Sequence, residues 1–337
     1  MAGRQRATDR GVTRHRLALT LPTPVQRLPI AALDGELWLK QDGLTHPLYG
    51  GNKTRKAAVL LEQAVQRGAR RVLTFGAAGS HHVLATTLFA RDFGLRVAAV
   101  LTPQPATEHA RAVLGRSLNA GLNAFPASSA WSALFTFLRC RRRGDYVVPP
   151  GGSNVHGALA YSLALSELEA QVDAGALPAP DWIVVPLGSG GTAAGLLAGL
   201  AQSRLPTRLL AVSVLGNPFA AAQIRFLAGR VLRSSARRLV DRAWPRRLLV
   251  DASQIGGGYG WSTSAGERAT ELARAHELTL DPTYTAKAFA AALELARGRP
   301  RAGPTRVLYW HTLSVPEGGP AATNALPLEL ARLLVSR

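Results

Sequence analysis

Segments typical of strands alternate with segments typical of helices in this chain, from about residue 50 onward. The strand-like segments are short apolar runs, namely Arg71–Phe75, Leu95–Leu101, Tyr146–Val148, Trp182–Leu187, Leu209–Leu215 and Thr305–His311. The helix-like segments are Ala57–Val65, Ser80–Phe93, Ala106–Ala120, Ala130–Arg142, Val155–Val172, Thr192–Gln202, Ala265–His276 and Thr283–Arg297. This alternation predicts an α/β fold with mainly parallel sheets, each covered by helices on both faces. Such sheets bind ligands at the carboxyl ends of their strands.

The chain of 337 residues is long enough for two domains, although no low-complexity linker marks a boundary. No apolar run is long enough to span a bilayer, so we expect no membrane association. Cys140 is the only cysteine, which excludes an intrachain disulfide and favours a cytoplasmic location. The basic, acid-poor segment Arg4–Arg16 predicts an N-terminal tail over residues 1–20, and an organelle transit peptide is the alternative.

The formal net charge of +19 comes almost entirely from arginine, which clusters at residues 139–143 and 233–247. A polyanion-binding surface would explain these clusters, and so would a solvated, arginine-rich surface. Only Trp244 lies among them, which is too little aromatic surface for stacking on bases. We therefore expect no specific nucleic-acid partner, and keep a basic protein associated with nucleic acid or membranes as an alternative function.

The chain has only four lysines, Lys40, Lys53, Lys56 and Lys287. An amine that loses its proton and attacks a carbonyl must be lysine, because guanidinium stays protonated. If the protein forms a Schiff base, one of these four residues forms it. Lys53 and Lys56 lie in the segment Gly50–Lys56, where two glycines precede a predicted helix. Cations are unfavourable at a helix N-terminus, so this pair indicates a bound anion or a neutralised amine.

A second glycine-rich turn, Gly188–Thr192, lies between a predicted strand and a predicted helix. This arrangement presents free backbone N–H groups and the positive end of a helix dipole to an anion. The turn has neither the Lys-Ser/Thr ending of a P-loop nor the spacing of a dinucleotide site. It therefore predicts a site for a single phosphate.

Three further segments carry polar groups at turns. Gly76–His82 places Ser80, His81 and His82 at a strand end, where Ser80 is either a helix N-cap or a functional hydroxyl. Adjacent histidines without a nearby carboxylate do not suit a metal ion, so we expect no metal site. Gly256–Gly260 and Asp281–Lys287 place Tyr259 and Tyr284 beside turns.

In combination, these segments resemble the pyridoxal-phosphate-dependent family of D-cysteine desulfhydrase and 1-aminocyclopropane-1-carboxylate deaminase. The resemblance runs from about Leu21 to about Pro316 and includes all four lysines. The matching segments are Leu21–Pro24, Leu39–Asp42, Gly50–Lys56, Gly151–Asn154, Gly188–Thr192, Gly258–Gly260, Asp281–Lys287 and His311–Thr312.

The resemblance implies the tryptophan synthase β-like fold, with two three-layer domains and a homodimeric assembly. The smaller domain would span 50–160 and carry Lys53 and Ser80, and the larger would comprise 21–49 plus 161–337. Lys53 would form the Schiff base with pyridoxal phosphate, and Ser80, Tyr259 and Tyr284 would act on the substrate. The implied cofactor-binding residues are Asn52, Lys53, Lys56, His81, Gly188, Ser189, Gly190, Gly191, Thr192, Thr285 and Thr312.

Several residues depart from the family pattern. His81 replaces an asparagine that contacts the cofactor's ring oxygen. Thr285 replaces a glutamate that keeps the pyridine nitrogen protonated, and either Thr285 or Thr312 could face that nitrogen. Leu313 and Ser314 replace a glycine pair beside the substrate.

A neutral hydroxyl at the ring nitrogen weakens the electron sink and favours β-elimination over opening of a cyclopropane ring. The resemblance thus implies a lyase or deaminase that converts a small amino acid such as D-cysteine to a keto acid and ammonia. The alternatives are a 1-aminocyclopropane-1-carboxylate deaminase and a divergent cofactor-binding protein with another amino-acid substrate.

Overall fold

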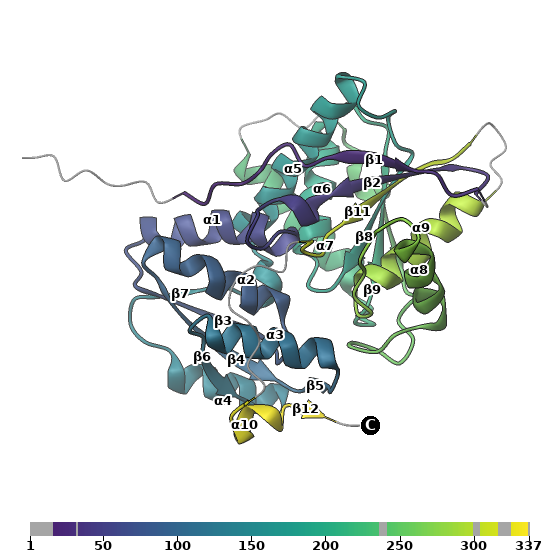
Figure 1. Ribbon diagram of the computed structural model, residues 1–337. Coiled ribbons are helices and arrows are strands. Elements are labelled where there is room, and N and C mark those ends of the chain that lie inside the picture. Colours follow the sequence, from purple (N-terminus) through teal and green to yellow (C-terminus); the bar gives the residue numbers. More distant parts are fainter. Residues whose placement is uncertain (1–15, 32, 236–240, 299–303, 316–324, 336–337) are drawn as a thin grey trace, which may run out of the picture.

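The computed structural model describes residues 16–335 except 32, 236–240, 299–303 and 316–324. It contains two β-sheets, each covered by helices, that lie side by side (Figure 1). The larger sheet has the strand order β1-β2-β11-β8-β9-β10. Its strands are β1 (Val25–Leu28), β2 (Glu36–Gln41), β8 (Trp182–Leu187), β9 (Arg208–Ser213), β10 (Leu248–Asp251) and β11 (Arg306–His311). Only the β1–β2 pair is antiparallel, as expected of an edge hairpin on a parallel sheet.

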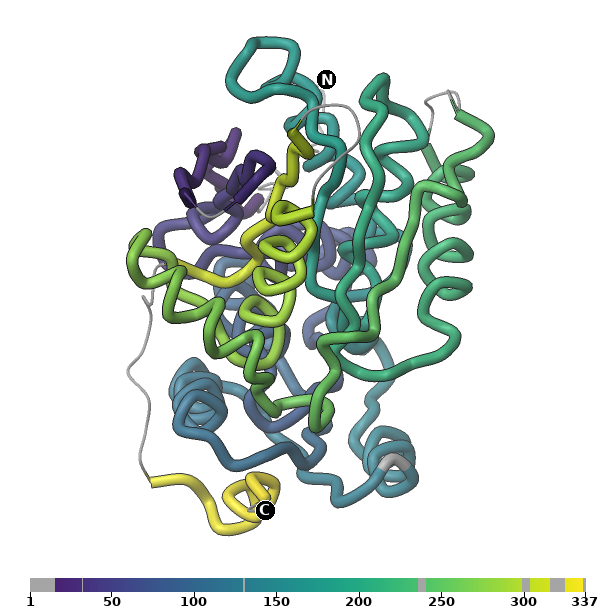
Figure 2. The backbone as a smooth tube through the Cα atoms, turned by 90° about the vertical axis from the view of Figure 1, so that its right-hand side faces the viewer, coloured from purple at the N-terminus to yellow at the C-terminus, as the bar shows by residue number. Residues whose placement is uncertain are grey.

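The smaller sheet has the order β6-β4-β3-β7 and is entirely parallel. Its strands are β3 (Arg71–Ala77), β4 (Arg96–Thr102), β6 (Asn123–Pro126) and β7 (Asp145–Val147). A separate pair joins β5 (Gln104–Pro105) to β12 (Leu334–Val335) near the C-terminus. The chain therefore returns to the smaller sheet at its end, as the yellow segment in Figure 2 shows.

Helices cover both faces of each sheet. The helices α1 (Asn52–Gln66), α2 (His81–Ala90) and α3 (Glu108–Asn119) bury their apolar residues on one face of the smaller sheet, and α4 (Ala130–Cys140) covers the other. On the larger sheet, α5 (Val155–Asp173), α6 (Gly191–Gln202) and α7 (Ala220–Ser234) lie opposite α8 (Ser264–Arg274) and α9 (Thr285–Arg297). The expected α/β class with three-layer arrangements is confirmed.

The predicted strands and helices all occur, with ends that differ by a few residues. The largest difference is α1, which begins at Asn52 and not near Ala57, because Gly51 forms its N-cap at φ 85°. We did not predict the strands β1, β2, β5, β6, β10 and β12 or the helices α7 and α10 (Leu328–Ala331), and the predicted domain boundaries stay a prediction. The short helix α10 and β12 contribute Leu330, Leu333 and Leu334 to the core beneath α1, α2 and α3.

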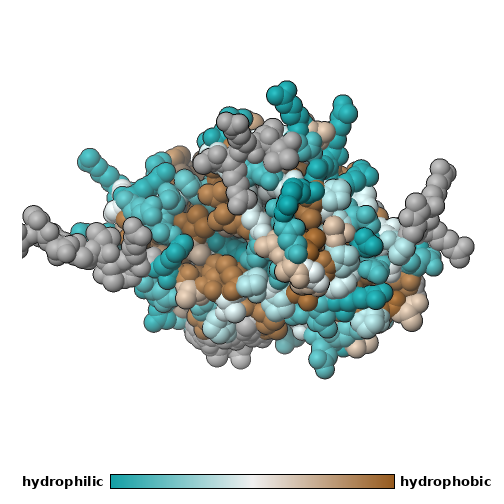
Figure 3. Space-filling view, turned by 90° about the horizontal axis from the view of Figure 1, so that it is seen from above, coloured by the Kyte–Doolittle hydropathy of each residue, from teal (hydrophilic) through white to brown (hydrophobic). Residues whose placement is uncertain are grey.

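Hydrophilic side chains project from the edge of the molecule, with smaller hydrophobic patches between them (Figure 3). Residues 1–15 of the expected tail lie outside the described residues, as do positions 236–240 of the second arginine cluster, whereas Leu17 is buried in the core. Among the described residues, no helix is long and apolar enough to cross a membrane. In the same part of the chain, no three histidine, cysteine or acidic residues gather as metal ligands.

Candidate active site

Lys53 lies in the first turn of α1, and the two glycines before the helix determine how it enters the site. A Cβ atom on Gly50 would lie 1.8 Å from the Gly43 carbonyl oxygen, and one on Gly51 would lie 2.4 Å from that of Thr312. Gly51 also has a positive φ of 85°, which other residues rarely adopt. Because only glycine fits these close approaches, the two glycines hold the start of α1 against Gly43 and against the segment after β11.

A single pocket gathers most of the predicted site residues. It lies between the start of α1, the start of α6 and the loops before α9 and after β11, where strands of the larger sheet end. The predicted residues that line it are Asn52, Lys53, Lys56, His81, Gly188, Ser189, Gly190, Gly191, Thr192, Tyr284, Thr285 and Thr312, together with Leu313 and Ser314. Ser80 and Tyr259 do not line it in the described structure.

The Lys53 amine is held in a poorly solvated position. Burial lowers its pKa to about 8, and the nearby negative charge of Asp281 opposes this shift. The amine lies beside Gly151, where a Cβ atom would stand 3.8 Å from Nζ. A lysine with this pKa is neutral far more often near neutral pH than an ordinary lysine, so it can act as a nucleophile.

Lys56 lies one turn further along α1, where its Nζ donates to the Gly151 carbonyl at 3.3 Å. Burial, followed by the positive charge of Lys53, lowers its pKa well below the ordinary value. An anion placed between these two amines would favour their charged forms. The pair is therefore suited to a phosphate group.

The glycine-rich turn Gly188–Thr192 forms the opposite wall. Gly190 has φ 86° and precedes α6, whose first N–H groups have no acceptor within the helix. Ser153 Oγ accepts from the Gly191 N–H at 3.0 Å and contacts Ser189 Oγ at 2.7 Å. Asn52 Nδ2 donates to Thr192 Oγ1 at 3.2 Å, which joins the first turns of α1 and α6.

The two tyrosines meet at the pocket edge. Tyr284 Oη donates to Tyr259 Oη at 3.1 Å, so Tyr259 is linked to the pocket through Tyr284. Lys287 holds the turn that carries Tyr259, because its Nζ donates to the carbonyls of Ile255 at 2.8 Å and Gly258 at 3.2 Å. Burial raises the pKa of Tyr259, and that of Tyr284 still further, so both hydroxyls stay protonated at neutral pH.

Ser80 is the N-cap of α2, as one of the two predictions for it stated, and its Oγ accepts from the Val83 N–H at 3.4 Å. His81 follows it and lines the pocket, but both of its ring nitrogens already have partners. Nδ1 contacts the Tyr49 hydroxyl, and Nε2 lies 2.8 Å from His109 Nε2. Burial, followed by the charge of His109, lowers the pKa of His81 to about 3.

The remaining departures from the family pattern have local explanations. Thr285 Oγ1 donates to Asp281 Oδ2 at 2.6 Å and accepts from the Asp281 N–H at 2.7 Å, so its proton is already committed. Ser314 Oγ accepts from the Gly50 N–H at 2.8 Å and thereby ties the loop after β11 to the start of α1. Thr312 accepts from the Asn52 N–H through its carbonyl oxygen, at 3.1 Å.

Sequence reasoning missed three residues of this site. Tyr49 and Asp281 line the pocket, and His109 contacts His81. Tyr49 directly precedes Gly50 and Asp281 begins a matched segment, so adjacency was a usable signal for both. His109 had none, because α3 is brought to the site only by the fold.

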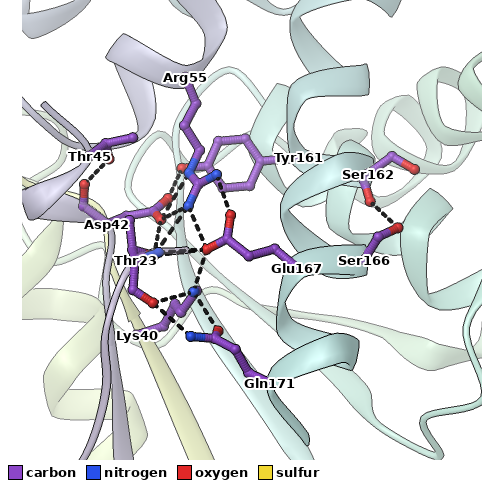
Figure 4. Close-up of polar contacts among 10 residues, drawn as sticks. All are labelled: Thr23, Lys40, Asp42, Thr45, Arg55, Tyr161, Ser162, Ser166, Glu167 and Gln171. Atoms are coloured by element: carbon purple, nitrogen blue, oxygen red, sulfur yellow. Dashed lines mark hydrogen bonds and ion pairs between the residues drawn. The ribbon is translucent and has the colours of Figure 1, made fainter. Parts of the chain in front are cut away.

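A buried network behind the pocket fixes α1 against α5 and β2 (Figure 4). Arg55 donates to Asp42 Oδ1 at 2.8 Å and to Glu167 Oε2 at 2.9 Å. Lys40 donates to Glu167 Oε1 at 2.6 Å, and Tyr161 donates to Asp42. The positive charges of Arg55 and Lys40 thus balance the negative charges of Asp42 and Glu167. Arg55 lies two residues after Lys53 in α1, so the network holds the helix that carries Lys53.

The residues present fit pyridoxal phosphate. Lys53 offers an amine of lowered pKa, while Lys56 and the first N–H groups of α6 offer donors suited to a phosphate. Tyr284, Thr285 and Thr312 line the same pocket. When bound, this cofactor supplies an electron sink for cleavage at the amino-acid α-carbon.

Comparisons with known proteins agree with this geometry. The family described as "Pyridoxal-phosphate dependent enzyme" matches residues 17–312. The nocardicin C-9' epimerase of Nocardia uniformis subsp. tsuyamanensis is 34% identical over 291 residues, covering 83% of this chain and 87% of that protein. The D-cysteine desulfhydrase of Klebsiella pneumoniae subsp. pneumoniae is 30% identical over 311 residues, covering 88% of this chain and 92% of that one.

A solved structure shows the same fold. The crystal structure of an ACC deaminase homologue superposes with a TM-score of 0.75 at 28% identity, and the match covers 90% of this chain and 92% of that chain. The fold is therefore tryptophan synthase β-like, as the sequence predicted. Since the family match covers most of the chain and includes all the residues that line the pocket except Leu313 and Ser314, the chain belongs to the pyridoxal-phosphate-dependent enzymes.

Proposed function

We propose that this protein is a lyase that eliminates a β-substituent from a small amino acid, with D-cysteine as the favoured substrate class, and yields a keto acid and ammonia. The observation that carries the proposal is the placement of Lys53, with a pKa of about 8, opposite the phosphate-suited start of α6. The 30% identity to a D-cysteine desulfhydrase supports the reaction class.

In this proposal, each polar group of the pocket has one task. Lys53 attaches the cofactor and then moves the α-proton of the substrate, while Lys56 and the Gly188–Thr192 turn hold the phosphate. Tyr284 faces the substrate from the pocket lining, and Tyr259 acts on the substrate through the hydrogen bond between the two protonated hydroxyls. Thr312 would be the hydroxyl available to the ring nitrogen, because the Thr285 proton is already donated to Asp281.

Ser80 has a narrower task in the proposal. Its hydroxyl accepts from the Val83 N–H and keeps its own proton for a substrate carboxylate at the N-terminus of α2. A helix N-terminus favours a carboxylate by the same dipole and N–H groups that favour a phosphate.

Borohydride reduction of the cofactor-loaded protein, followed by peptide mapping, tests the attachment. We expect the adduct on Lys53 and none in Lys53→Ala. An adduct on Lys40, Lys56 or Lys287, or on no lysine, contradicts the assignment. Sulfide, keto acid and ammonia are then measured with D- and L-cysteine, D-serine and 1-aminocyclopropane-1-carboxylate.

Epimerisation of an amino acid is a second candidate, which the 34% identity to an epimerase favours. An epimerase removes a proton from one face of the α-carbon and returns one to the other, so it needs two acid–base groups. Tyr49 lines the pocket from outside α1 and could supply the second. Chiral analysis of the amino acid after incubation in D2O separates the two. Deuterated substrate of both configurations without keto acid indicates an epimerase, and keto acid with ammonia indicates a lyase.

We also propose that the protein is a cytoplasmic homodimer with a smaller domain of residues 50–160, and without a specific nucleic-acid or membrane partner. The single cysteine, Cys140, is buried, which suits a reducing compartment. Sedimentation of the purified protein tests the assembly. Binding to DNA that disappears at moderate salt would fit a merely solvated basic surface, and salt-resistant binding would contradict the proposal.

A further inference from the structure

Tyr49, His81 and His109 form a continuous chain of side chains that the proposed lyase reaction does not use. His81 Nδ1 contacts the Tyr49 hydroxyl, and His81 Nε2 lies 2.8 Å from His109 Nε2. Tyr49 is buried at 3% exposure and lines the pocket, whereas His109 is partly exposed on α3. The chain therefore runs from the pocket toward solvent.

The geometry couples the protons of the three residues. Two imidazole nitrogens 2.8 Å apart share one hydrogen bond, so one of them donates while the other accepts. If His81 donates to His109, its Nδ1 accepts the hydroxyl proton of Tyr49. If His109 donates, His81 carries its proton on Nδ1 and donates to Tyr49, whose own proton then points elsewhere. The tautomer of His109 thus determines the direction of the Tyr49 hydroxyl.

We propose that Tyr49, His81 and His109 are a proton relay that connects the pocket with solvent, in which Tyr49 is the catalytic residue at the pocket end. His81 and His109 act through Tyr49 and are positioning residues. This inference rests on the proposed function, because it assumes that a proton is exchanged at a substrate in the pocket.

The transfer balances without a net change of charge. Tyr49 oxygen takes a proton from the pocket as its own hydroxyl proton passes to His81 Nδ1. The proton on His81 Nε2 passes to His109 Nε2, and His109 releases its Nδ1 proton to water. One proton enters, one leaves, and each imidazole ends as its other tautomer. The reverse sequence delivers a solvent proton to the substrate.

The charged groups around His81 favour its neutral form, which a relay of this kind needs. His109 and Arg116 face it from α3, and Lys53 faces it from α1, and each of these charges lowers its pKa. Asp281 faces it from the loop before α9 and opposes them. Burial is the largest cause and outweighs Asp281, so the pKa of His81 falls to about 3. Arg116 also lies 5.9 Å above the Tyr49 ring, where it favours negative charge on the phenol oxygen.

The test uses the holoenzyme and the variants Tyr49→Phe, His109→Phe and His109→Ala, with His276→Phe as the matched control. His276 is a partly exposed histidine in the turn after α8, outside the pocket lining. We expect cofactor loading to stay complete in all four. In the three relay variants, kcat should fall by about tenfold or more with little change in KM, and exchange of the substrate α-hydrogen with D2O should slow equally. Added imidazole should restore His109→Ala and leave Tyr49→Phe unchanged.

The absorption of the bound cofactor separates the relay from a merely structural role, and turnover by the wild type separates it from the proposed function. The visible absorption of the bound cofactor without substrate should change with pH at a different midpoint in Tyr49→Phe and His109→Phe than in the wild type and His276→Phe. A wild type that loads cofactor but turns over no amino acid refutes the proposed function, and the absorption midpoints then decide on the relay alone. Unchanged midpoints, or an active His109→Ala without imidazole dependence, overturn the relay.

Discussion

At the scale of single residues, three of the four lysines are fully buried. Lys40, Lys56 and Lys287 are at most 1% exposed, and each donates to oxygen atoms in a confined space. An ammonium group is compact, whereas a guanidinium is planar and needs a wider acceptor arrangement. Arginine supplies most of the positive charge of this protein, and three of the four lysines serve as buried amines.

The lowered pKa of Lys53 predicts how the apoprotein takes up its cofactor. Burial disfavours the charged amine, so the neutral form that attacks a carbonyl appears as the pH rises through about 8, and not through the ordinary 10.5. The rate of cofactor attachment, followed by visible absorbance, should therefore level off above a midpoint near this value. Lys53→Arg should show no attachment at any pH. A rate that still rises steeply toward the ordinary value would contradict the prediction.

Lys287 predicts a separate effect on the substrate side. In Lys287→Met, the carbonyls of Ile255 and Gly258 lose their donor, which costs about 1–3 kcal/mol of the free energy of unfolding. The turn that carries Tyr259 should loosen, so KM should rise several-fold while cofactor loading stays complete. Denaturant unfolding and steady-state kinetics measure the two effects. Glu294→Met, an exposed change on the same helix, is the control and should alter neither.

At the scale of elements, the start of α6 is positioned by close packing against α5. Gly191, Gly195 and Gly199 repeat every four residues and therefore share one face of the helix. A Cβ atom on Gly195 would lie 2.1 Å from the Ala158 carbonyl oxygen, and one on Gly199 would lie 2.6 Å from Leu165 Cβ. The glycines let the two helices approach until the N-terminus of α6 reaches the pocket.

Gly195→Ala should therefore lower the stability of the protein and also weaken cofactor binding at the start of α6. Because the clash involves backbone of α5, we expect a loss of about 1–3 kcal/mol in the free energy of unfolding and weaker cofactor binding. Gly229→Ala is the matched control in α7, since its nearest neighbour is the end of the flexible Arg233 side chain at 3.6 Å. That change should stabilise by about 0.5–1 kcal/mol. Equal stability of both variants in urea would refute the packing argument.

The elements that the sequence predicted are those whose signal is local. The continuous apolar run Trp182–Leu187 and the glycine turn after it predicted β8, α6 and their shared edge. Helix α7 was missed because its pattern is interrupted by exposed Phe226 and by arginines. Tyr49 and His109 were missed as partners because they are 60 positions apart and meet only through His81. Long-range contacts between polar side chains leave no periodicity in a sequence.

At the scale of the whole molecule, the buried network of Figure 4 joins segments that are far apart in the chain. Thr23, Lys40 and Asp42 come from the N-terminal part, Arg55 from α1 and Glu167 from α5. The network therefore links the start of the larger sheet to the helix that carries Lys53. It makes the position of Lys53 depend on the ionisation of Glu167.

This dependence predicts how Glu167→Gln changes the response to acid. Burial opposes ionisation of Glu167, but hydrogen bonds and charges from Arg55 and Lys40 outweigh it and lower its pKa from 4.5 to about 2. A carboxylate whose pKa is lower in the folded state stabilises that state above its ordinary pKa, and loses this contribution as the pH falls toward the folded value.

At neutral pH, Glu167→Gln leaves Arg55 and Lys40 with one carboxylate less and should cost on the order of 3 kcal/mol of the free energy of unfolding. Near about pH 3, part of the wild-type contribution is already lost, so the difference between the two proteins should shrink. Urea unfolding at both pH values measures this difference, with the exposed Glu271→Gln as the control that changes little at either. A destabilisation of the same size at both pH values would show that Glu167 acts by packing and not by its charge.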